Sequence, residues 1–246
     1  MNERFLSSGT WIASGSAVVA ELASECGFDW LLLDLEHGCL SEPDILYSLM
    51  AVKGSAAKPI VRVGKTDPVL IARVLDWGAA GIMLPHVSTP EQAGQCLEAM
   101  YYPPAGNRGY TSSARTFGYG IRPPDNVPDH PHPLFLAQIE DHKGVENAAA
   151  IAAIPGVDVL FVGPSDLKLN LSAHAPQLDF ADALSEVSSA AALHRKQAGI
   201  LVRDPAEIPL LRSGGYSCLA LGSDLGILRK GFEQYSKLVQ NHFNPD

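Results

Sequence analysis

The feature that most limits the fold of this sequence is an alternation of short apolar runs with longer segments of helical period. Eight such pairs follow one another along the 246 residues. Apolar runs rich in β-branched residues, alternating with amphipathic segments, are typical of βα units and a parallel sheet. A chain of this length with eight such units fits the α/β class and one closed (β/α)8 TIM barrel, so we expect a single domain over residues 1–246. The predicted strands are Thr10–Ala13, Trp30–Leu33, Pro59–Val63, Gly81–Leu84, Leu134–Ile139, Asp158–Val162, Ile200–Val202 and Cys218–Leu221.

Several of the segments between these runs carry helix-end signals. Asp67 and Thr89 each precede a proline, which predicts an N-cap residue followed by proline at the first helical position. Gly27 and Gly78 stand where a helix should end. The predicted helices include Ser16–Cys26, Asp44–Val52, Pro68–Trp77, Pro90–Met100 and Leu178–Lys196.

One connection does not fit the regular pattern. The stretch Tyr102–Pro133 is rich in proline and glycine and is too long for a passive link between a helix and a strand. Such a loop is either functional or disordered. We favour a functional wall or a partner-contacting segment.

Charge and hydropathy exclude several classes of function. The formal net charge is -9, and no basic run is present that could neutralise the phosphates of nucleic acid or an anionic membrane. Residues 1–15 lack the basic start and apolar stretch of a signal peptide, and no segment approaches 18 uninterrupted apolar residues. We therefore expect a cytoplasmic protein.

The cysteines predict neither a zinc site nor a redox pair. Cys26, Cys39, Cys96 and Cys218 lie far apart and form no CxxC motif. Cys26 and Cys218 stand in apolar-periodic segments, where we expect them to be small buried residues.

Two carboxylates are expected at the catalytic rim of the barrel. The active site of such a barrel lies at the carboxyl ends of its strands. Glu140 and Asp166 follow adjacent predicted strands, and no lysine or arginine stands directly beside either in sequence. Two such acids repel unless a cation neutralises them, and oxygen ligands suit Mg²⁺ or Mn²⁺ better than zinc. The alternative is that Asp166 is a surface acid that caps the following helix.

Three further polar residues follow predicted strands. His37 comes soon after the second strand and could move a proton near neutral pH, while Arg62 of the third strand could hold a carboxylate or polarise an oxo group. Taken singly, each has a structural alternative, as a satisfied core histidine or an arginine paired with a structural aspartate. His86, after the fourth strand, either faces the pocket or has a solvated or structural role.

Several blocks of this sequence resemble the HpcH/HpaI aldolase family, in the family's order and spacing. They cover roughly residues 8 to 230. Members of this family are class II pyruvate aldolases that cleave 4-hydroxy-2-oxo acids, such as 4-hydroxy-2-oxoheptanedioate or 2-dehydro-3-deoxy sugar acids, to pyruvate and an aldehyde. The blocks are Gly27–His37, Pro59–Val63, Leu75–Ala79, Tyr102–Gly109, Gln138–Glu140 and Val162–Leu167.

The resemblance implies a role for each residue of the predicted rim. Glu140 and Asp166 would bind a divalent cation, Mg²⁺, Mn²⁺ or Co²⁺, which the 2-oxo acid also chelates and which stabilises the pyruvate enolate. Arg62 would lie on the oxo oxygen. His37, through a metal-linked water, would remove the proton from the C4 hydroxyl, with Asp34 orienting it.

The resemblance also implies substrate contacts and an assembly. Gln138 would lie beside the ion, and the backbone N–H groups around Gly163 and Ser165 would hold the substrate carboxylate. Ser165 stands where many relatives have alanine. Asp76 corresponds to a family acid near a subunit contact, and the family implies a homohexamer.

Three alternatives remain open at this point. A Schiff-base aldolase would need a lysine in the barrel mouth, and Lys65 and Lys168 lie beyond the ends of predicted strands. The same metal site could instead decarboxylate oxaloacetate or cleave a CoA thioester. A non-catalytic barrel would be expected to have lost one of His37, Arg62, Glu140 and Asp166, whereas all four are present.

Overall fold

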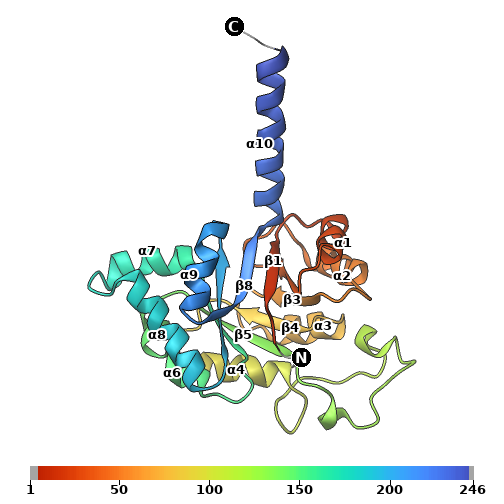
Figure 1. Cartoon of the computed structure of the whole chain (residues 1–246). Coiled ribbons are helices and arrows are strands. Elements are labelled where there is room, and N and C mark those ends of the chain that lie inside the picture. Colours follow the sequence, from red (N-terminus) through yellow and green to blue (C-terminus); the bar gives the residue numbers. More distant parts are fainter. Residues whose placement is uncertain (1–4, 244–246) are drawn as a thin grey trace.

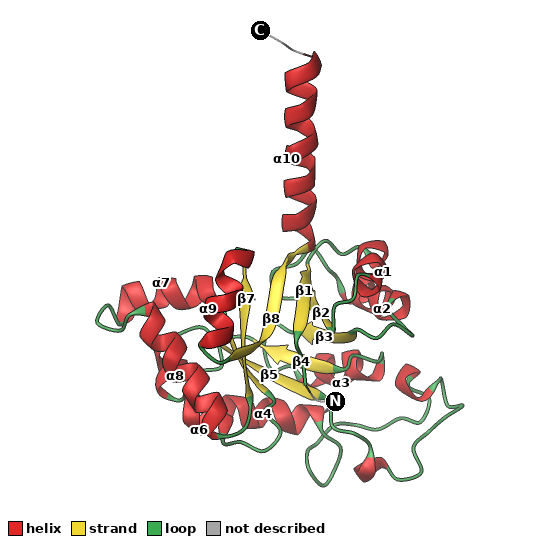
Figure 2. Ribbon diagram, viewed as in Figure 1, coloured by secondary structure: helices red, strands yellow, loops and turns green. Residues whose placement is uncertain are grey.

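The chain folds into a closed barrel of parallel strands in the order of the sequence. The structure is a computed structural model, which describes residues 5–243. Helices surround the barrel on its outside (Figures 1 and 2). The predicted (β/α)8 TIM barrel is confirmed. Its strands are β1 (Ser8–Ile12), β2 (Trp30–Asp34), β3 (Lys58–Arg62), β4 (Gly81–Leu84), β5 (Leu134–Ile139), β6 (Val159–Val162), β7 (Gln197–Val202) and β8 (Tyr216–Ser223).

The strand register gathers polar residues at the carboxyl ends of the strands. Asp34, the last residue of β2, pairs with Arg62, the last residue of β3. Ile139 of β5 pairs with Val162 of β6, so Glu140 and Gly163 leave the sheet side by side. The carboxyl ends of the strands share one rim, and these positions therefore lie close together.

Two helices begin where their N-cap and proline signals predict. Asp67 accepts hydrogen bonds from the N–H groups of Val69 and Leu70, and Thr89 forms a capping box with Gln92. A cap of this kind contributes about 1 kcal/mol. The helices are α1 (Ala17–Glu25), α2 (Glu42–Ala51), α3 (Pro68–Asp76), α4 (Pro90–Met100), α5 (His142–Glu146), α6 (Ala148–Ala152), α7 (Pro164–His174), α8 (Phe180–Leu193), α9 (Ile208–Ser213) and α10 (Asp224–Phe243).

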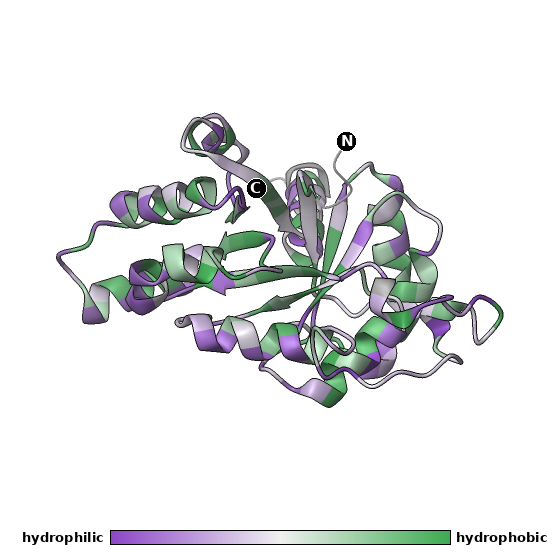
Figure 3. Ribbon diagram, turned by 90° about the horizontal axis from the view of Figure 1, so that it is seen from below, coloured by the Kyte–Doolittle hydropathy of each residue, from purple (hydrophilic) through white to green (hydrophobic). Residues whose placement is uncertain are grey.

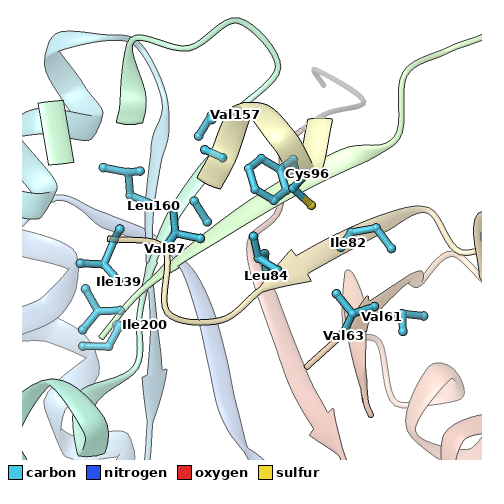
Figure 4. Close-up of a cluster of buried hydrophobic side chains, with 14 of the residues drawn as sticks. Val61, Val63, Ile82, Leu84, Val87, Cys96, Ile139, Val157, Leu160 and Ile200 are labelled. Carbon is cyan, nitrogen blue, oxygen red and sulfur yellow. The ribbon is translucent and has the colours of Figure 1, made fainter. Parts of the chain in front are cut away.

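The core consists of two apolar layers. One lies between the strands and the surrounding helices, and Figure 4 shows part of it, including Val61, Leu84 and Ile139. The other fills the barrel, where Trp30 meets Phe161 edge to face at 6.0 Å between ring centroids. A Cβ atom on Gly9 would lie 2.2 Å from the Trp30 ring, so this position requires glycine. Hydrophobic residues follow the strands and the inner faces of the helices (Figure 3).

The long connection Tyr102–Pro133 has contacts of its own. Tyr102, Ala114 and Phe117 form a small buried cluster outside the main core. Arg115 donates from Nη2 to the carbonyl oxygen of Leu49 at 3.1 Å and also bonds the carbonyl oxygen of Trp77. The segment is therefore tied to α2 and α3, while its functional role stays a prediction.

The cysteines are all free in the structure. Cys218 is buried as expected, and burial raises the pKa of its thiol. The expectation for Cys26 is wrong: this residue is exposed, because it is the C-cap of α1 at the end of the helix.

The C-terminal helix α10 leaves the barrel. It projects from the end of β8 as a separate rod (Figure 1), and its contacts with other elements are mainly with β1 and β8 near its start. Among the described residues, no helix is both long and apolar enough to cross a membrane.

Candidate active site

A cavity of about 150 Å³ opens at the carboxyl ends of the strands. Nearly all of the predicted site residues reach it, from four different strands or the loops after them, and Asp34 is hydrogen-bonded to Arg62. Larger cavities exist on the outside of the barrel, but Asp76 is the one predicted site residue that lines either of the two largest. The lining residues are Trp11, His37, Arg62, Gln138, Glu140, Gly163, Pro164, Ser165, Asp166, Leu201 and Arg203.

Arg62 is buried and held by two carboxylates. Its Nε and Nη2 donate to Asp34 Oδ1 and Oδ2 at 2.9 and 2.7 Å, while Nη1 lies 2.9 Å from Glu36 Oε2. Its guanidinium also lies over the Trp11 ring, 5.1 Å from the centroid. Burial opposes the charge of Arg62, but the hydrogen bond and charge of Asp34 outweigh burial and raise the pKa of Arg62. A bidentate pair of this kind fixes the orientation of the guanidinium plane.

Asp34 organises the backbone around His37. Burial raises the pKa of Asp34, but the hydrogen bond and charge of Arg62 outweigh it, so the net pKa is lowered. Asp34 Oδ1 accepts from the N–H groups of Glu36 and His37 at 3.0 and 3.2 Å. The contact of Asp34 with His37 is thus through the main chain, and the exposed imidazole lies 3.8 Å from Glu36 Oε1.

Glu140 is a buried carboxylate with neutral donors as its hydrogen-bond partners. Gln138 Nε2 donates to Oε1 at 2.7 Å, and the backbone N–H of His86 donates to Oε2 at 3.1 Å. His86 Nδ1 is also 3.3 Å from Oε2. Burial raises the pKa of Glu140, and the charges of Asp166 and Glu36 raise it further, although His86 acts in the opposite direction.

His86 adopts an unusual backbone conformation to make this contact. Its φ of 52° lies in the left-handed region, which is uncommon for a residue other than glycine. His86 does not line the cavity, and its amide and its exposed ring contact Glu140 instead, which agrees with the structural alternative.

Gly163 and Asp166 line the cavity together with Glu140. A Cβ atom on Gly163 would lie 2.1 Å from Glu140 Oε1, so the carboxylate occupies the space that a side chain would need. Asp166 stands in the first turn of α7 and faces the same cavity. Ser165 accepts a hydrogen bond at its Oγ from Arg203 Nη2 at 2.8 Å.

The residues around Glu140 fit a divalent cation with oxygen ligands. The side-chain oxygen of Gln138 is buried and has no hydrogen-bond partner, which is costly unless a cation or another donor approaches it. Over residues 5–243 no group of three or more His, Cys, Asp or Glu side chains is arranged around one point. Two carboxylates with water and substrate oxygens are the ligand set that Mg²⁺ commonly uses.

Asp76 does not reach this cavity. It ends α3 and pairs with the buried Arg108, whose Nη2 lies 2.6 Å from Asp76 Oδ1, at a separate cavity of about 670 Å³ outside the barrel. Arg108 also lies over the Tyr102 ring at 4.5 Å.

Trp11 and Arg203 line the site but were not among the predicted residues. Arg203 directly follows the predicted strand Ile200–Val202, so the same strand-end rule that found Glu140 points to it. Trp11 is inside the predicted strand Thr10–Ala13, where an apolar ring gives no signal of its own. Neither Lys65 nor Lys168 lines the cavity, and Lys168 lies over the Phe180 ring at 4.4 Å.

Comparison with known proteins places these residues in a family. A 5-keto-4-deoxy-D-glucarate aldolase from Salmonella arizonae is 37% identical over 228 residues, covering 92% of this chain and 89% of the relative. A protein of the same name from Salmonella gallinarum is 39% identical over 223 residues, covering 90% and 87%. A solved HpcH/HpaI aldolase/citrate lyase family protein from Burkholderia cenocepacia superposes with a TM-score of 0.88 at 30% identity, covering 96% and 95%. The family described as HpcH/HpaI aldolase/citrate lyase matches residues 7–231, and the chain therefore belongs to it, as the sequence predicted.

Proposed function

We propose that this protein cleaves a 4-hydroxy-2-oxo acid reversibly to pyruvate and an aldehyde, with a divalent cation bound at Glu140 and Asp166. Family membership and the named aldolases make the chain a carbon–carbon lyase. The observation that carries the finer proposal is the single small cavity shared by Arg62, Glu140 and Asp166, in which the buried oxygen of Gln138 has no partner. The names of the relatives support a sugar-derived di-acid as substrate.

The reaction breaks the bond between C3 and C4 of the acid. The C4 hydroxyl loses its proton, the oxygen keeps the electron pair and becomes the aldehyde oxygen, and the electrons of the broken bond pass to C3 and the oxo oxygen. Protonation at C3 then gives pyruvate. A divalent cation held by Glu140 and Asp166 would supply positive charge where the oxo oxygen becomes negative.

The side chains of the chain provide the remaining elements of the mechanism. Arg62, fixed by Asp34, places a permanent positive charge in the cavity beside the developing oxyanion. The backbone N–H groups around Gly163 and Ser165 hold the carboxylate of the acid, at the N-terminus of α7. Gln138 orients Glu140 through its amide nitrogen.

His37 is the proposed acceptor of the C4 hydroxyl proton. It lines the cavity and its ring is exposed, so a substrate or a water can reach its nitrogen atoms. His37→Ala should reduce aldol cleavage more than decarboxylation of oxaloacetate, because decarboxylation removes no hydroxyl proton. Equal losses in both reactions would contradict this role.

A Schiff-base mechanism is the second candidate, and the cavity lining speaks against it. Borohydride trapping with pyruvate tests it directly, because only an imine is captured. A chain of unchanged mass after this treatment supports the metal-dependent route.

Pyruvate release from a panel of 4-hydroxy-2-oxo acids tests the proposed function as a whole. The panel is assayed after chelation and again with Mg²⁺, Mn²⁺ or Co²⁺ restored, with oxaloacetate and CoA thioesters as alternative substrates. Activity that disappears with chelation and returns with the ion is expected. Activity that survives chelation would refute the metal-dependent mechanism.

We also propose that the protein is a homo-oligomer, with a hexamer as the expected form. Helix α10 exposes a stripe of residues spaced three and four apart, Leu225, Leu228, Phe232, Tyr235 and Val239. A stripe of this spacing is typical of a helix face that packs against a partner.

The barrel offers a complementary place for such a helix. The eighth helix of a (β/α)8 barrel normally packs between the helices that follow strands seven and one. Here these helices, α9 and α1, expose Leu210, Val18 and Leu22, while α10 points away from them. A second copy could place its α10 there.

Light scattering with size-exclusion chromatography tests the assembly. The expected mass is about six times the 26.2 kDa chain, and Phe232→Asp with Tyr235→Asp should lower it, whereas Leu193→Asp on the exposed face of α8 should not. A monomeric wild-type protein would contradict the proposal. The cytoplasmic location stays a prediction that cell fractionation can check.

A further inference from the structure

Arg203 is the feature of the site that the proposed mechanism leaves without a task. It follows β7, and its side chain and that of Leu201 line the same cavity as Glu140. Its Nη2 donates to Ser165 Oγ at 2.8 Å, which fixes the guanidinium against the first turn of α7. An arginine has five N–H donors, so most of this group is free to bind a ligand.

The acidic side chains around the cavity set the environment of Arg203. Glu140, Asp166 and Glu36 make the rim acidic, and the charge of Arg62 is taken up by Asp34 and Glu36. No ion pair joins Arg203 to a carboxylate within the described part of the chain, in contrast to Arg62. A carboxylate that enters this acidic cavity is repelled by the rim, and Arg203 is the lining arginine that no carboxylate of the described residues pairs with.

We propose that Arg203 binds the C1 carboxylate of the 2-oxo acid and thereby determines the preference of the site for acids. Ser165 acts as its positioning residue: its hydroxyl oxygen accepts from Arg203, which leaves the hydroxyl hydrogen to donate to the same carboxylate. Gly163 and Ser165, around which the backbone N–H groups are proposed to hold this carboxylate, line the same cavity as Arg203. The identity of the acid rests on the proposed function, whereas the binding of a carboxylate does not.

The experiment measures binding separately from turnover. Isothermal titration with oxalate and with pyruvate, each in the presence of Mg²⁺, compares the wild type with Arg203→Met, Arg203→Lys and Ser165→Ala. Loss of a charged hydrogen bond should weaken binding about 10-fold or more in Arg203→Met. Arg203→Lys, which keeps the charge without the planar fork, should recover part of this loss, and Ser165→Ala should show a smaller weakening.

Lys168→Met is the matched control. It removes a neighbouring cation from α7, one that lies over Phe180 and does not line the cavity, so its affinity should equal that of the wild type. In turnover, Arg203→Met should raise KM about 10-fold and leave kcat within about threefold, because the carboxylate is bound in both ground and transition states. A purely structural role for Arg203 would instead lower Tm without this separation of KM and kcat.

Each outcome decides between the two proposals. Unchanged affinity in Arg203→Met, with turnover intact in the wild type, would overturn the role of Arg203 and leave the proposed function standing. Arg203-dependent binding without pyruvate release from any 4-hydroxy-2-oxo acid would support the carboxylate site and contradict the aldolase. A wild-type protein that binds neither oxalate nor pyruvate would overturn the inference.

Discussion

The two halves of the catalytic rim differ in how their charges are balanced. On β2 and β3, the charge of Arg62 is matched by Asp34 and Glu36 within hydrogen-bonding distance, and the pKa of Asp34 is lowered. On β5 and β6, Glu140 accepts hydrogen bonds from the Gln138 amide and the His86 backbone, lies near other acids, and has a raised pKa. The first half is complete as the chain folds. The second half needs a positive charge that these two strands do not provide.

This difference predicts which half stabilises the fold and which carries the chemistry. A buried ion pair is costly to break because the remaining partner keeps its charge without compensation. Glu140 lies near other acids, so removing its carboxylate leaves no buried charge without a partner. Substitutions in the first half should therefore reduce stability, with activity also lost at Arg62, while those in the second should reduce activity and leave the fold intact.

The largest effect is expected at Glu140. Glu140→Ala, and likewise Asp166→Ala, should reduce metal-dependent pyruvate release below detection, because one of the two carboxylates proposed to hold the cation is lost. The Tm of the chelated protein should not fall by more than a few degrees. Full activity in either variant would contradict the assignment of these residues.

Asp34→Asn should give the largest loss of stability. It leaves Arg62 buried without its bidentate partner, at an expected cost of about 3 to 5 kcal/mol in the free energy of unfolding near pH 7. Because the pKa of Asp34 is lowered in the folded protein, its contribution is complete above the usual carboxyl range and disappears as pH falls through the folded-state pKa. Denaturant titrations at several pH values should show the difference between wild type and variant shrinking toward acid.

Arg62→Ala should affect both properties. Loss of one oxyanion-stabilising donor commonly lowers kcat by about 10²- to 10³-fold. Arg62→Lys is the control for folding. It keeps a cation beside Asp34 but loses the planar guanidinium that makes two hydrogen bonds to this carboxylate. If Arg62→Lys retains wild-type kcat, charge alone is sufficient and the orientation imposed by Asp34 has no catalytic role.

The smallest effect is expected at Glu36. Glu36→Gln removes one of the two acids on Arg62 and leaves the bidentate Asp34 pair in place. The expected loss is about 1 kcal/mol in unfolding free energy, which thermal unfolding can measure. A loss as large as that of Asp34→Asn would show that Arg62 depends equally on both acids.

The sequence predicted the barrel and the rim because both depend on local patterns. Runs of apolar residues set the strands, and the segments that follow these runs placed His37, Glu140 and Asp166 at one edge. The partner of a polar residue was harder to predict. The pairing of Asp76 with Arg108 joins residues 32 positions apart, and the position of Asp34 beneath Arg62 depends on strand register.

Other features could not be read from local patterns at all. The left-handed backbone of His86 and the hydrogen bond from Arg203 to Ser165 arise from the packing of separate loops. The direction of α10 depends on which surface packs against its apolar stripe. The spacing of the stripe does not reveal whether that surface belongs to the same chain or to a second copy.

The close approach of Glu140 to Gly163 divides the wall of the cavity into positions that can vary and positions that cannot. No side chain fits at Gly163 without displacing the carboxylate, so directed evolution of a new substrate preference should find no tolerated change there. Ser165 and Arg203 lie on the exposed side of the same wall, where replacements meet solvent. Libraries that hold Gly163 constant and randomise these two positions should therefore retain folded proteins with Glu140 in place while changing how strongly they bind the carboxylate of the acid.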